Sequence, residues 1–367
     1  MIAAVLRRVR HMGKQWAARS PGNGGGGGGG GCGIHFDANG MQFVRITRTS
    51  GSDRLRLDAY GAAALEDDML RGALIVKPEA VARRLEELLE RLGMRAEALQ
   101  DDAIVLALPS HGLKTQVIDC PAGLPPRALR AWCQRRAALL LPGDGDPDLR
   151  SRVGVAWAEP GSHRLRLYAC EATLADDRMA VLEMSGLRAQ AIDAAHQAGR
   201  RAFLWAQRAA QGTSASNDHV AFALAASVGG DRTSGPGALL QIDAQTLDLA
   251  VFDGAVCVGD VRERFDGVRG HPDALASVVR DLTRALPISP HVIDVATQGA
   301  SPAELAAICD AVASACGVAV RPFDPLATFD RAESAGRRQD TYVPHASLAV
   351  PCGLALRAMS MQGVACG

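Results

Sequence analysis

The chain has 367 residues, and its 40 lysines and arginines balance its 40 aspartates and glutamates, so the formal net charge is zero. This length allows two domains with separate hydrophobic cores, and the neutral balance gives no reason to expect a nucleic-acid partner. Nine cysteines are scattered without a CxxC pair, which predicts free thiols in a reducing compartment and argues against zinc. No apolar run has the length of a membrane span or the pattern of a secretory signal, which predicts a cytoplasmic protein.

The amino terminus combines a basic segment with a glycine tract. Residues 1–20 carry five lysines and arginines, no acid and several apolar side chains, so they form either an amphipathic helix on an anionic membrane surface or a frayed basic tail. Residues 24–31 are eight consecutive glycines. A phosphate-binding loop needs glycines at defined spacing, whereas a uniform run has no side chain to select one shape. The sequence therefore predicts a basic tail and a flexible linker over residues 1–31.

Two stretches far apart in the chain share the same order of short strands. Between residues 33 and 61, the runs GIHFD, MQFVRITR and RLRLDAYG alternate apolar and polar residues and are separated by turn residues, which predicts a three-stranded meander. Residues 237–261 repeat that order with GALLQID, LDLAVF and AVCVGDV. Residues 35–38 then align with residues 241–244, which indicates an internal duplication of one α/β unit.

Two further segments predict helices. Residues 77–93 (KPEAVARRLEELLERLG) place their leucines on one face and precede the strand DAIVLALP. Residues 301–317 begin with Ser301 as N-cap and have Glu304 three residues later, which is the pattern of a capping box. The turn 297–300 before this helix follows the strand HVIDVA, and such strand ends are where open α/β sheets bind ligands.

The pattern changes between residues 113 and 165. A strand (KTQVIDCP), a basic helix (PPRALRAWCQRRAALLL) and a hairpin around Pro160-Gly161 predict a small α+β insertion in the first half. A stretch rich in glycine, serine and alanine at residues 211–237 marks the junction between the halves. The predicted boundaries are 32–112 and 166–220 for the first domain, 113–165 for the inserted subdomain and 221–367 for the second domain.

Several segments carry a resemblance to a known family: GIHFDANGMQ, IVLALPSHGLKTQVIDCPAGLP, SGLRAQAIDAAHQAGRRAF, VAVRPFDPLATFD and LAVPCGLALRAM. In this order they resemble the PilM family of type IV pilus assembly proteins, which are relatives of the cell-division protein FtsA among the actin-like ATPases. The resemblance runs from Gly33 to Met359, and its last two segments are fairly specific to PilM. It implies an α/β fold: an actin-like (ribonuclease H-like) duplicated two-domain fold with a small α+β inserted subdomain.

The resemblance also implies where ATP and Mg²⁺ would bind. The nucleotide-binding residues that it implies lie in three turns: Asp37, Ala38, Asn39 and Gly40; Asp243, Ala244, Gln245 and Thr246; and Gln298, Gly299 and Ala300. In actin-like ATPases the first strand of each half ends in Asp-x-Gly. Here His35 and Asp37 occupy these two positions in the first half, and Gln241 and Asp243 occupy them in the second.

These substitutions leave two interpretations open. Residues two apart in a strand face the same side, so Asp37 and Asp243 are candidates to bind Mg²⁺ in place of the lost carboxylates. Alternatively, each carboxylate sets a negative charge beside the triphosphate, and its Cβ blocks the close approach of the backbone, which leaves a degenerate site and a protein that is not an enzyme. We favour the degenerate site, with His35 as a buried, hydrogen-bonded core histidine.

The function that the resemblance implies is a cytoplasmic scaffold of type IV pilus assembly, peripheral to the inner membrane. A groove near residues 106–168 would bind the cytoplasmic tail of a PilN-like inner-membrane protein, other pilus assembly proteins would be further partners, and residues 1–20 would touch the membrane surface weakly. The alternatives are an active ATP-hydrolysing actin-like protein, a sugar or carboxylate kinase of the same fold, and the cytoplasmic part of a type II secretion protein. A kinase requires intact phosphate loops, which are missing here.

Overall fold

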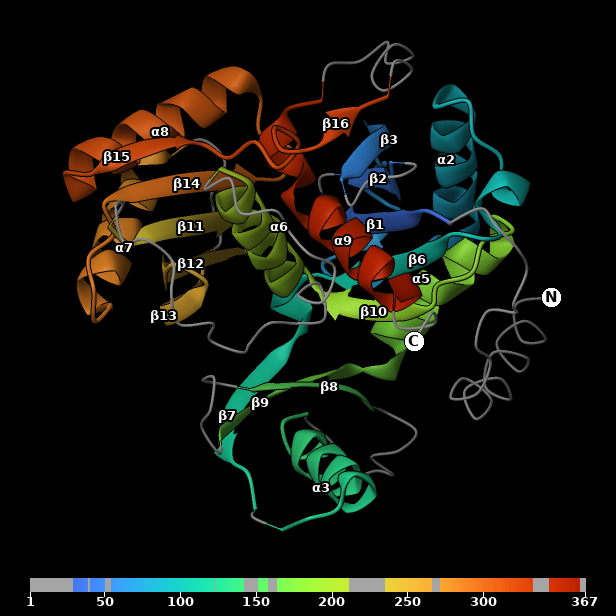
Figure 1. Ribbon diagram of the computed structural model, residues 1–367, viewed down its shortest axis with the longest axis horizontal. Helices are drawn as coiled ribbons and strands as arrows, with labels where there is room; N and C mark the ends of the chain where they lie inside the picture. Colours follow the sequence, from blue (N-terminus) through green and yellow to red (C-terminus); the bar gives the residue numbers. More distant parts are fainter. Residues whose placement is uncertain are drawn as a thin grey trace.

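The computed structural model describes residues 29–38, 40–49, 54–121, 123–141, 151–157, 164–210, 235–265, 271–332 and 343–363. Two large sheets lie side by side with helices around them, and a smaller sheet with one helix projects from the pair (Figure 1). The basic tail predicted over residues 1–20 lies outside the described residues. The predicted linker ends earlier than residue 31, because β1 begins at Gly31 and Gly30 N donates a hydrogen bond to Asp102 Oδ1 at 2.5 Å.

The first sheet contains six strands in the order β10-β6-β1-β2-β3-β16. Their bounds are Gly31–Asp37 (β1), Gly40–Arg48 (β2), Leu55–Ala63 (β3), Ala103–Leu108 (β6), Ala191–Ala194 (β10) and Asp330–Arg331 (β16). β1 to β3 form an antiparallel meander, and β6 and β10 continue the sheet as parallel strands. Every residue of β1 and β6 is buried, as expected for central strands that are covered on both faces.

The second sheet repeats this topology. Its order is β13-β12-β11-β14-β15. The bounds are Gly237–Ile242 (β11), Thr246–Asp253 (β12), Val256–Arg264 (β13), Val292–Thr297 (β14) and Ala319–Pro322 (β15). β11 to β13 are antiparallel and β14 and β15 are parallel additions, as in the first sheet. The duplication and both meanders predicted from the sequence are confirmed.

Helices cover both sheets. Their bounds are Pro78–Arg91 (α2), Ala172–Met184 (α5), Ala195–Ala210 (α6), Pro272–Ala285 (α7), Pro302–Cys316 (α8) and Ala349–Gly363 (α9). α2 and α5 pack together beside the first sheet and α7 and α8 beside the second, while α6 and α9 lie between the sheets (Figure 1). The cluster around α6 and α9 contains Val44 and Leu239 from the two sheets, so one hydrophobic core joins the halves.

The carboxyl-terminal segment returns to the first half of the molecule. β16 pairs with β3, and α9 packs against β1, β6 and α6. Gly353 allows the contact with α6, because a Cβ at this position would lie 1.8 Å from Ala198 O. β16 and α9 thus lie against the first sheet, although they belong to residues 221–367, for which the sequence predicts the second domain. Because α9 is buried on nearly all sides, its sequence has no polar face to indicate which sheet it covers.

The insertion forms a small unit of its own. Its strands are Lys114–Asp119 (β7), Ser151–Trp157 (β8) and Arg164–Glu171 (β9), in the order β7-β9-β8, and its helix is Pro126–Ala138 (α3). Cys133 and Ala137 of α3 are buried against Leu165 and Leu167 of β9. The sequence predicts this strand, basic helix and hairpin, although β9 continues beyond the predicted boundary at residue 165.

Short elements complete the described structure. They are the strands Leu70–Arg71 (β4) and Leu74–Ile75 (β5) and the 3₁₀ helices Ala96–Leu99 (η1), Ser110–Gly112 (η2) and His345–Leu348 (η4). Among the described residues, we find no helix with the length and apolar character that a bilayer crossing requires. The cysteines in these ranges are all free thiols, as the sequence predicts.

Candidate functional site

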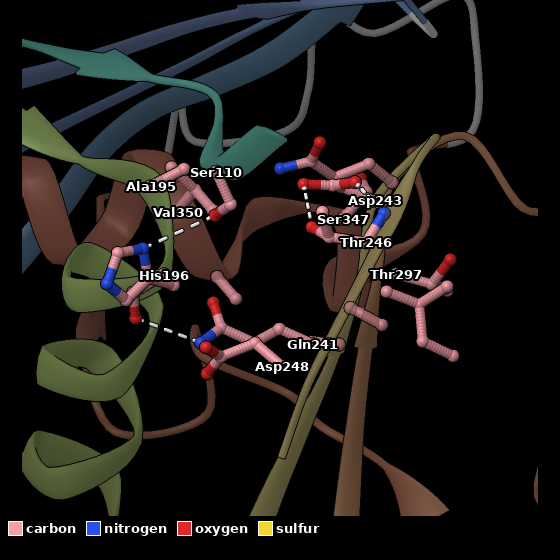
Figure 2. A pocket seen from close by; sticks show the side chains of 15 residues that line it. Ser110, Ala195, His196, Gln241, Asp243, Thr246, Asp248, Thr297, Ser347 and Val350 are labelled. Carbon is pink, nitrogen blue, oxygen red and sulfur yellow. Dashed lines mark hydrogen bonds between the residues drawn. The ribbon is translucent and has the colours of Figure 1, made fainter. Parts of the chain in front are cut away.

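The halves meet at a cleft between the ends of β6 and β11 (Figure 2). Nine of its lining residues are polar: Ser110, His196, Gln241, Asp243, Thr246, Asp248, Thr297, Gln298 and Ser347. The cavity has a volume of about 20 Å³. One ordered water needs about 10–15 Å³ by the same measure, so this cavity has room for about one water molecule and not for a nucleotide.

His35, which the sequence aligns with the first carboxylate of actin-like ATPases, is buried. Its side chain is 1% exposed. Nε2 lies 3.3 Å from Gln298 Oε1 in the second half and 3.5 Å from Asp37 Oδ2. The contact with Gln298 joins the halves across the cleft, and this environment fits the core-histidine role expected from the sequence.

Asp37 is buried near a cation of the protein itself. Arg178 of α5 is fully buried, and it donates from Nη1 to Leu174 O at 2.9 Å and from Nη2 to Phe36 O at 3.5 Å. Burial lowers the pKa of Arg178 to about 10, while the charges of Asp177 and Asp37 oppose this decrease. Arg178 therefore stays cationic at neutral pH and offsets the negative charge of Asp37.

His111 of η2 lies near both predicted magnesium carboxylates. Burial is the main cause that lowers its pKa, the charges of Arg178 and His35 lower it further, and Asp243 and Asp37 oppose the shift. Neither ring nitrogen has a hydrogen-bond partner among the described residues. At neutral pH the imidazole is uncharged, so it adds no positive charge that would attract a phosphate.

The carboxylate of Asp243 is engaged in its own turn. It accepts hydrogen bonds from Gln245 N at 2.8 Å, Thr246 N at 2.6 Å and Thr246 Oγ1 at 2.7 Å, which close the connection between β11 and β12. Ala244 is half-buried within this turn. Such a carboxylate stabilises the turn as an aspartate does in other Asx turns, and a metal ion would compete with these three donors.

Gln241, which the sequence aligns with the second carboxylate of actin-like ATPases, contacts α6. Its Nε2 donates to His196 O at 2.9 Å, and its side chain is buried. A Cβ on Gly199 would lie 1.8 Å from Gln241 Oε1, so the amide fills the space beside a bare helix backbone. Gln241 therefore joins the second sheet to the helix between the halves.

The third predicted turn precedes α8. Gln298 N donates to Ile242 O at 3.2 Å, Gly299 has a φ of 72°, and Ala300 is half-buried. The capping box predicted from the sequence is confirmed, because Ser301 N donates to Glu304 Oε2 at 2.7 Å and Glu304 N to Ser301 Oγ at 3.2 Å. The carboxylate of Glu304 thus already lies at the helix end that would attract an anion.

The remaining predicted residues lie in the first turn. Ala38 is exposed, Gly40 begins β2 with a φ of 139°, and Asn39 lies outside the described residues. No group of three or more histidine, cysteine, aspartate or glutamate side chains in the described ranges is arranged to hold a metal ion. The magnesium role of Asp37 and Asp243 stays a prediction, and their protein contacts favour the degenerate site.

Similarity to known proteins is found among solved structures. No family model and no curated protein matches the sequence. Among solved structures, the chain is similar to a PilM-PilN type IV pilus biogenesis complex, with a TM-score of 0.67 and 15% identity over 90% of this chain and 98% of that chain. The fold is actin-like. The fold class predicted from the sequence is confirmed.

Two further solved structures share less with this chain. One is a Bacteroides thetaiotaomicron protein of unknown function with an actin-like ATPase fold (TM-score 0.44, 7% identity, 82% of this chain and 95% of that chain). The other is the cytoplasmic domain of EpsL, an inner membrane component of the type II secretion system of Vibrio cholerae (TM-score 0.38, 8% identity, 91% of this chain and 94% of that chain). Neither similarity is high enough to carry an argument about function.

In this actin-like fold, a network of ion pairs lies beside the cleft. Arg200 of α6 donates to Asp248 Oδ1 at 2.7 Å and to Asp260 Oδ2 at 3.0 Å. Arg262 donates to Asp248 Oδ2 at 3.1 Å, and Arg166 of the inserted subdomain to Asp260 Oδ1 at 2.8 Å. Burial raises the pKa of both carboxyls, but the arginines outweigh it and the net shift is downward. These ion pairs connect the inserted subdomain and α6 to the second sheet.

Several residues of this site were not predicted from the sequence. Arg178 lies in the run ADDRMAV, which has the composition of an exposed helix face, and only the fold shows that it is buried. His111 has no motif around it that marks a site. Gly199 did carry a signal, because a glycine inside a helical pattern often marks a close packing contact.

Proposed function

We propose that the protein is a scaffold of type IV pilus assembly that binds the cytoplasmic tail of a PilN-like inner-membrane protein and does not hydrolyse ATP. The observation that carries this proposal is the similarity to the PilM-PilN structure over nearly the full length of both chains. Binding such a tail would place the protein at the cytoplasmic face of the inner membrane. Other pilus assembly proteins would join through the same partner.

The contacts within the cleft support a scaffold rather than an ATPase. Gln241 donates to α6, Asp243 closes its own turn, and Asp37 lies near the buried charge of Arg178. An ATPase would need these positions free for phosphate and Mg²⁺. The rival interpretation, with Mg²⁺ on Asp37 and Asp243, requires both carboxylates to leave their present environments.

The junction between the first half and the inserted subdomain is the best place for an extended tail. Leu74 in β5 and Val76 just after this strand are 41% and 47% exposed. Ala73 lies next to Gly112, where the chain enters β7. Among the described strands β7 pairs only with β9, so its other edge offers backbone groups to an added strand. Apolar side chains beside a strand edge suit an extended, apolar peptide.

A calorimetric titration with the synthetic cytoplasmic tail of the organism's own PilN-like protein tests this proposal. We expect saturable binding by the natural chain. Leu74→Asp with Val76→Asp should weaken it at least about tenfold, since burial of each side chain contributes about 1.5–3 kcal/mol. Ile288→Asp is the matched control, because Ile288 is also exposed, at 39%, but lies in the second half. Absence of binding by the natural chain would overturn the proposed function.

A further inference from the structure

The outer face of α3 is strongly basic. Arg127, Arg135 and Arg136 of this helix are all exposed. Residues 114–121 and 123–141 together contain one lysine and four arginines, but a single acid, Asp119. The chain as a whole has no net charge, so this face is a local excess of positive charge.

The fold fixes the direction in which this face points. Cys133 and Ala137 on the opposite side of α3 are 2% and 0% exposed, and they pack on Leu165 and Leu167 of β9. α3 lies at the end of the inserted subdomain, away from the two large sheets (Figure 1). The arginines are therefore available to a partner without any change of fold.

Apolar side chains accompany the arginines. Leu139, directly after the helix, is 76% exposed, and Leu124, just before it, is 36% exposed. The guanidinium of Arg136 lies over the ring of the half-buried Trp132, 5.7 Å from its centroid. Basic side chains and an aromatic ring on one helix, with exposed leucines at its two ends, are typical of segments that lie at a membrane interface.

We propose that this face of α3, which we define as Arg127, Trp132, Arg135, Arg136 and Leu139, binds a membrane surface that contains acidic phospholipids. Guanidinium groups form charge-assisted hydrogen bonds with lipid phosphates. Leu139 distinguishes this partner from a nucleic acid, because an exposed aliphatic side chain gains from the acyl boundary of a bilayer and gains nothing from a phosphate backbone. The surface includes none of residues 1–20 and needs no protein partner, so it goes beyond the proposed function.

Sedimentation of the full chain with vesicles tests the proposal. Phosphatidylcholine vesicles with added phosphatidylglycerol should bind the protein, and pure phosphatidylcholine vesicles should not. Each cationic side chain near an anionic surface contributes about fivefold, so Arg127→Gln, Arg135→Gln and Arg136→Gln together should lower partitioning at least about tenfold. The control changes Arg71, Arg83 and Arg95 to glutamine, because these arginines are also exposed but lie on the first domain. The control should leave partitioning within about twofold of the natural value, since its charges lie away from the proposed surface.

Two further variants distinguish binding to a bilayer from binding to a nucleic acid and from binding through residues 1–28. Leu139→Ser should weaken vesicle binding while leaving any binding to a single-stranded oligonucleotide unchanged, which would support a bilayer. Deletion of residues 1–28 should leave the effect of the three α3 substitutions in place. Equal vesicle binding by the α3 variant and the control would overturn the proposal. Preferential binding to the oligonucleotide that the α3 substitutions abolish would also overturn it, in favour of a nucleic-acid surface.

Discussion

Gln241 is a buried amide that joins the second sheet to the helix between the halves. Its amide donates to His196 O, and its oxygen lies against Gly199 of α6. A carboxylate at this position would have no N–H to donate and would face the His196 carbonyl across a buried contact. A carboxylate at position 241 is therefore incompatible with the packing of this side chain against α6.

Gln241→Glu tests that contact with an isosteric change. We expect the free energy of unfolding in urea at pH 7 to fall by about 2–4 kcal/mol, because a charge is buried and a hydrogen bond is lost. Gln245→Glu, on the half-buried turn, is the control and should cost about 0.5 kcal/mol or less. Equal stability of the two variants would contradict the role assigned to Gln241.

His196 predicts a pH dependence of stability. Burial lowers its pKa well below the usual value, and the charges of Arg262, Arg200 and Arg166 add to this effect. Below about pH 6.5 the unfolded chain binds a proton at this residue that the folded chain does not bind, so stability falls by about 1.4 kcal/mol per pH unit as the pH decreases. Urea denaturation between pH 7 and pH 5 should show a shallower slope for His196→Gln than for the natural chain. Identical slopes for the variant and the natural chain would exclude this interpretation.

At the scale of elements, α6 and α9 hold the two halves together through close backbone contacts. A Cβ on Gly353 would lie 1.8 Å from Ala198 O, which belongs to the backbone, whereas a Cβ on Gly199 would meet the movable end of the Gln241 side chain. Steric overlap with a backbone atom is relieved only by moving a helix.

Alanine substitutions compare these two contacts. Gly353→Ala should cost about 3 kcal/mol or more of unfolding free energy, while Gly199→Ala should cost about 1–2 kcal/mol, since Gln241 can turn away and alanine improves helix propensity. Chemical denaturation of both variants measures the difference. A larger loss for Gly199→Ala would show that the cleft contact, and not the α6–α9 contact, holds the halves together.

Local patterns in the sequence predicted the elements well. The capping box of Ser301 and Glu304 and the two meanders depend on residues within a few positions of one another, and they are observed. The contacts in the candidate site, by contrast, join residues that lie far apart in the sequence. Arg178 reaches the end of β1 from α5, and Gln298 reaches His35 from the other half. No local pattern encodes such contacts. The sequence therefore predicts where the three turns lie along the chain, but it does not predict which side chains of the protein pack against them.

On the scale of the whole molecule, the duplicated sheets enclose a cleft that is filled from both sides. The ion pairs of Arg200 and Arg166 hold α6 and the inserted subdomain to the second sheet. An actin-like protein that cycles with ATP needs its halves to open and close around the nucleotide. Here the contacts across the cleft favour one fixed arrangement, which suits a scaffold that presents a constant binding surface.

The affinity for the PilN-like tail, measured by calorimetry with and without saturating ATP and Mg²⁺, tests this account most directly. A scaffold with a degenerate cleft should bind the tail with the same dissociation constant in both conditions, and no ATP should be hydrolysed during the titration. Tail binding that appears only with ATP and Mg²⁺, and that Asp37→Ala abolishes, would contradict the account and establish the relocated magnesium site instead.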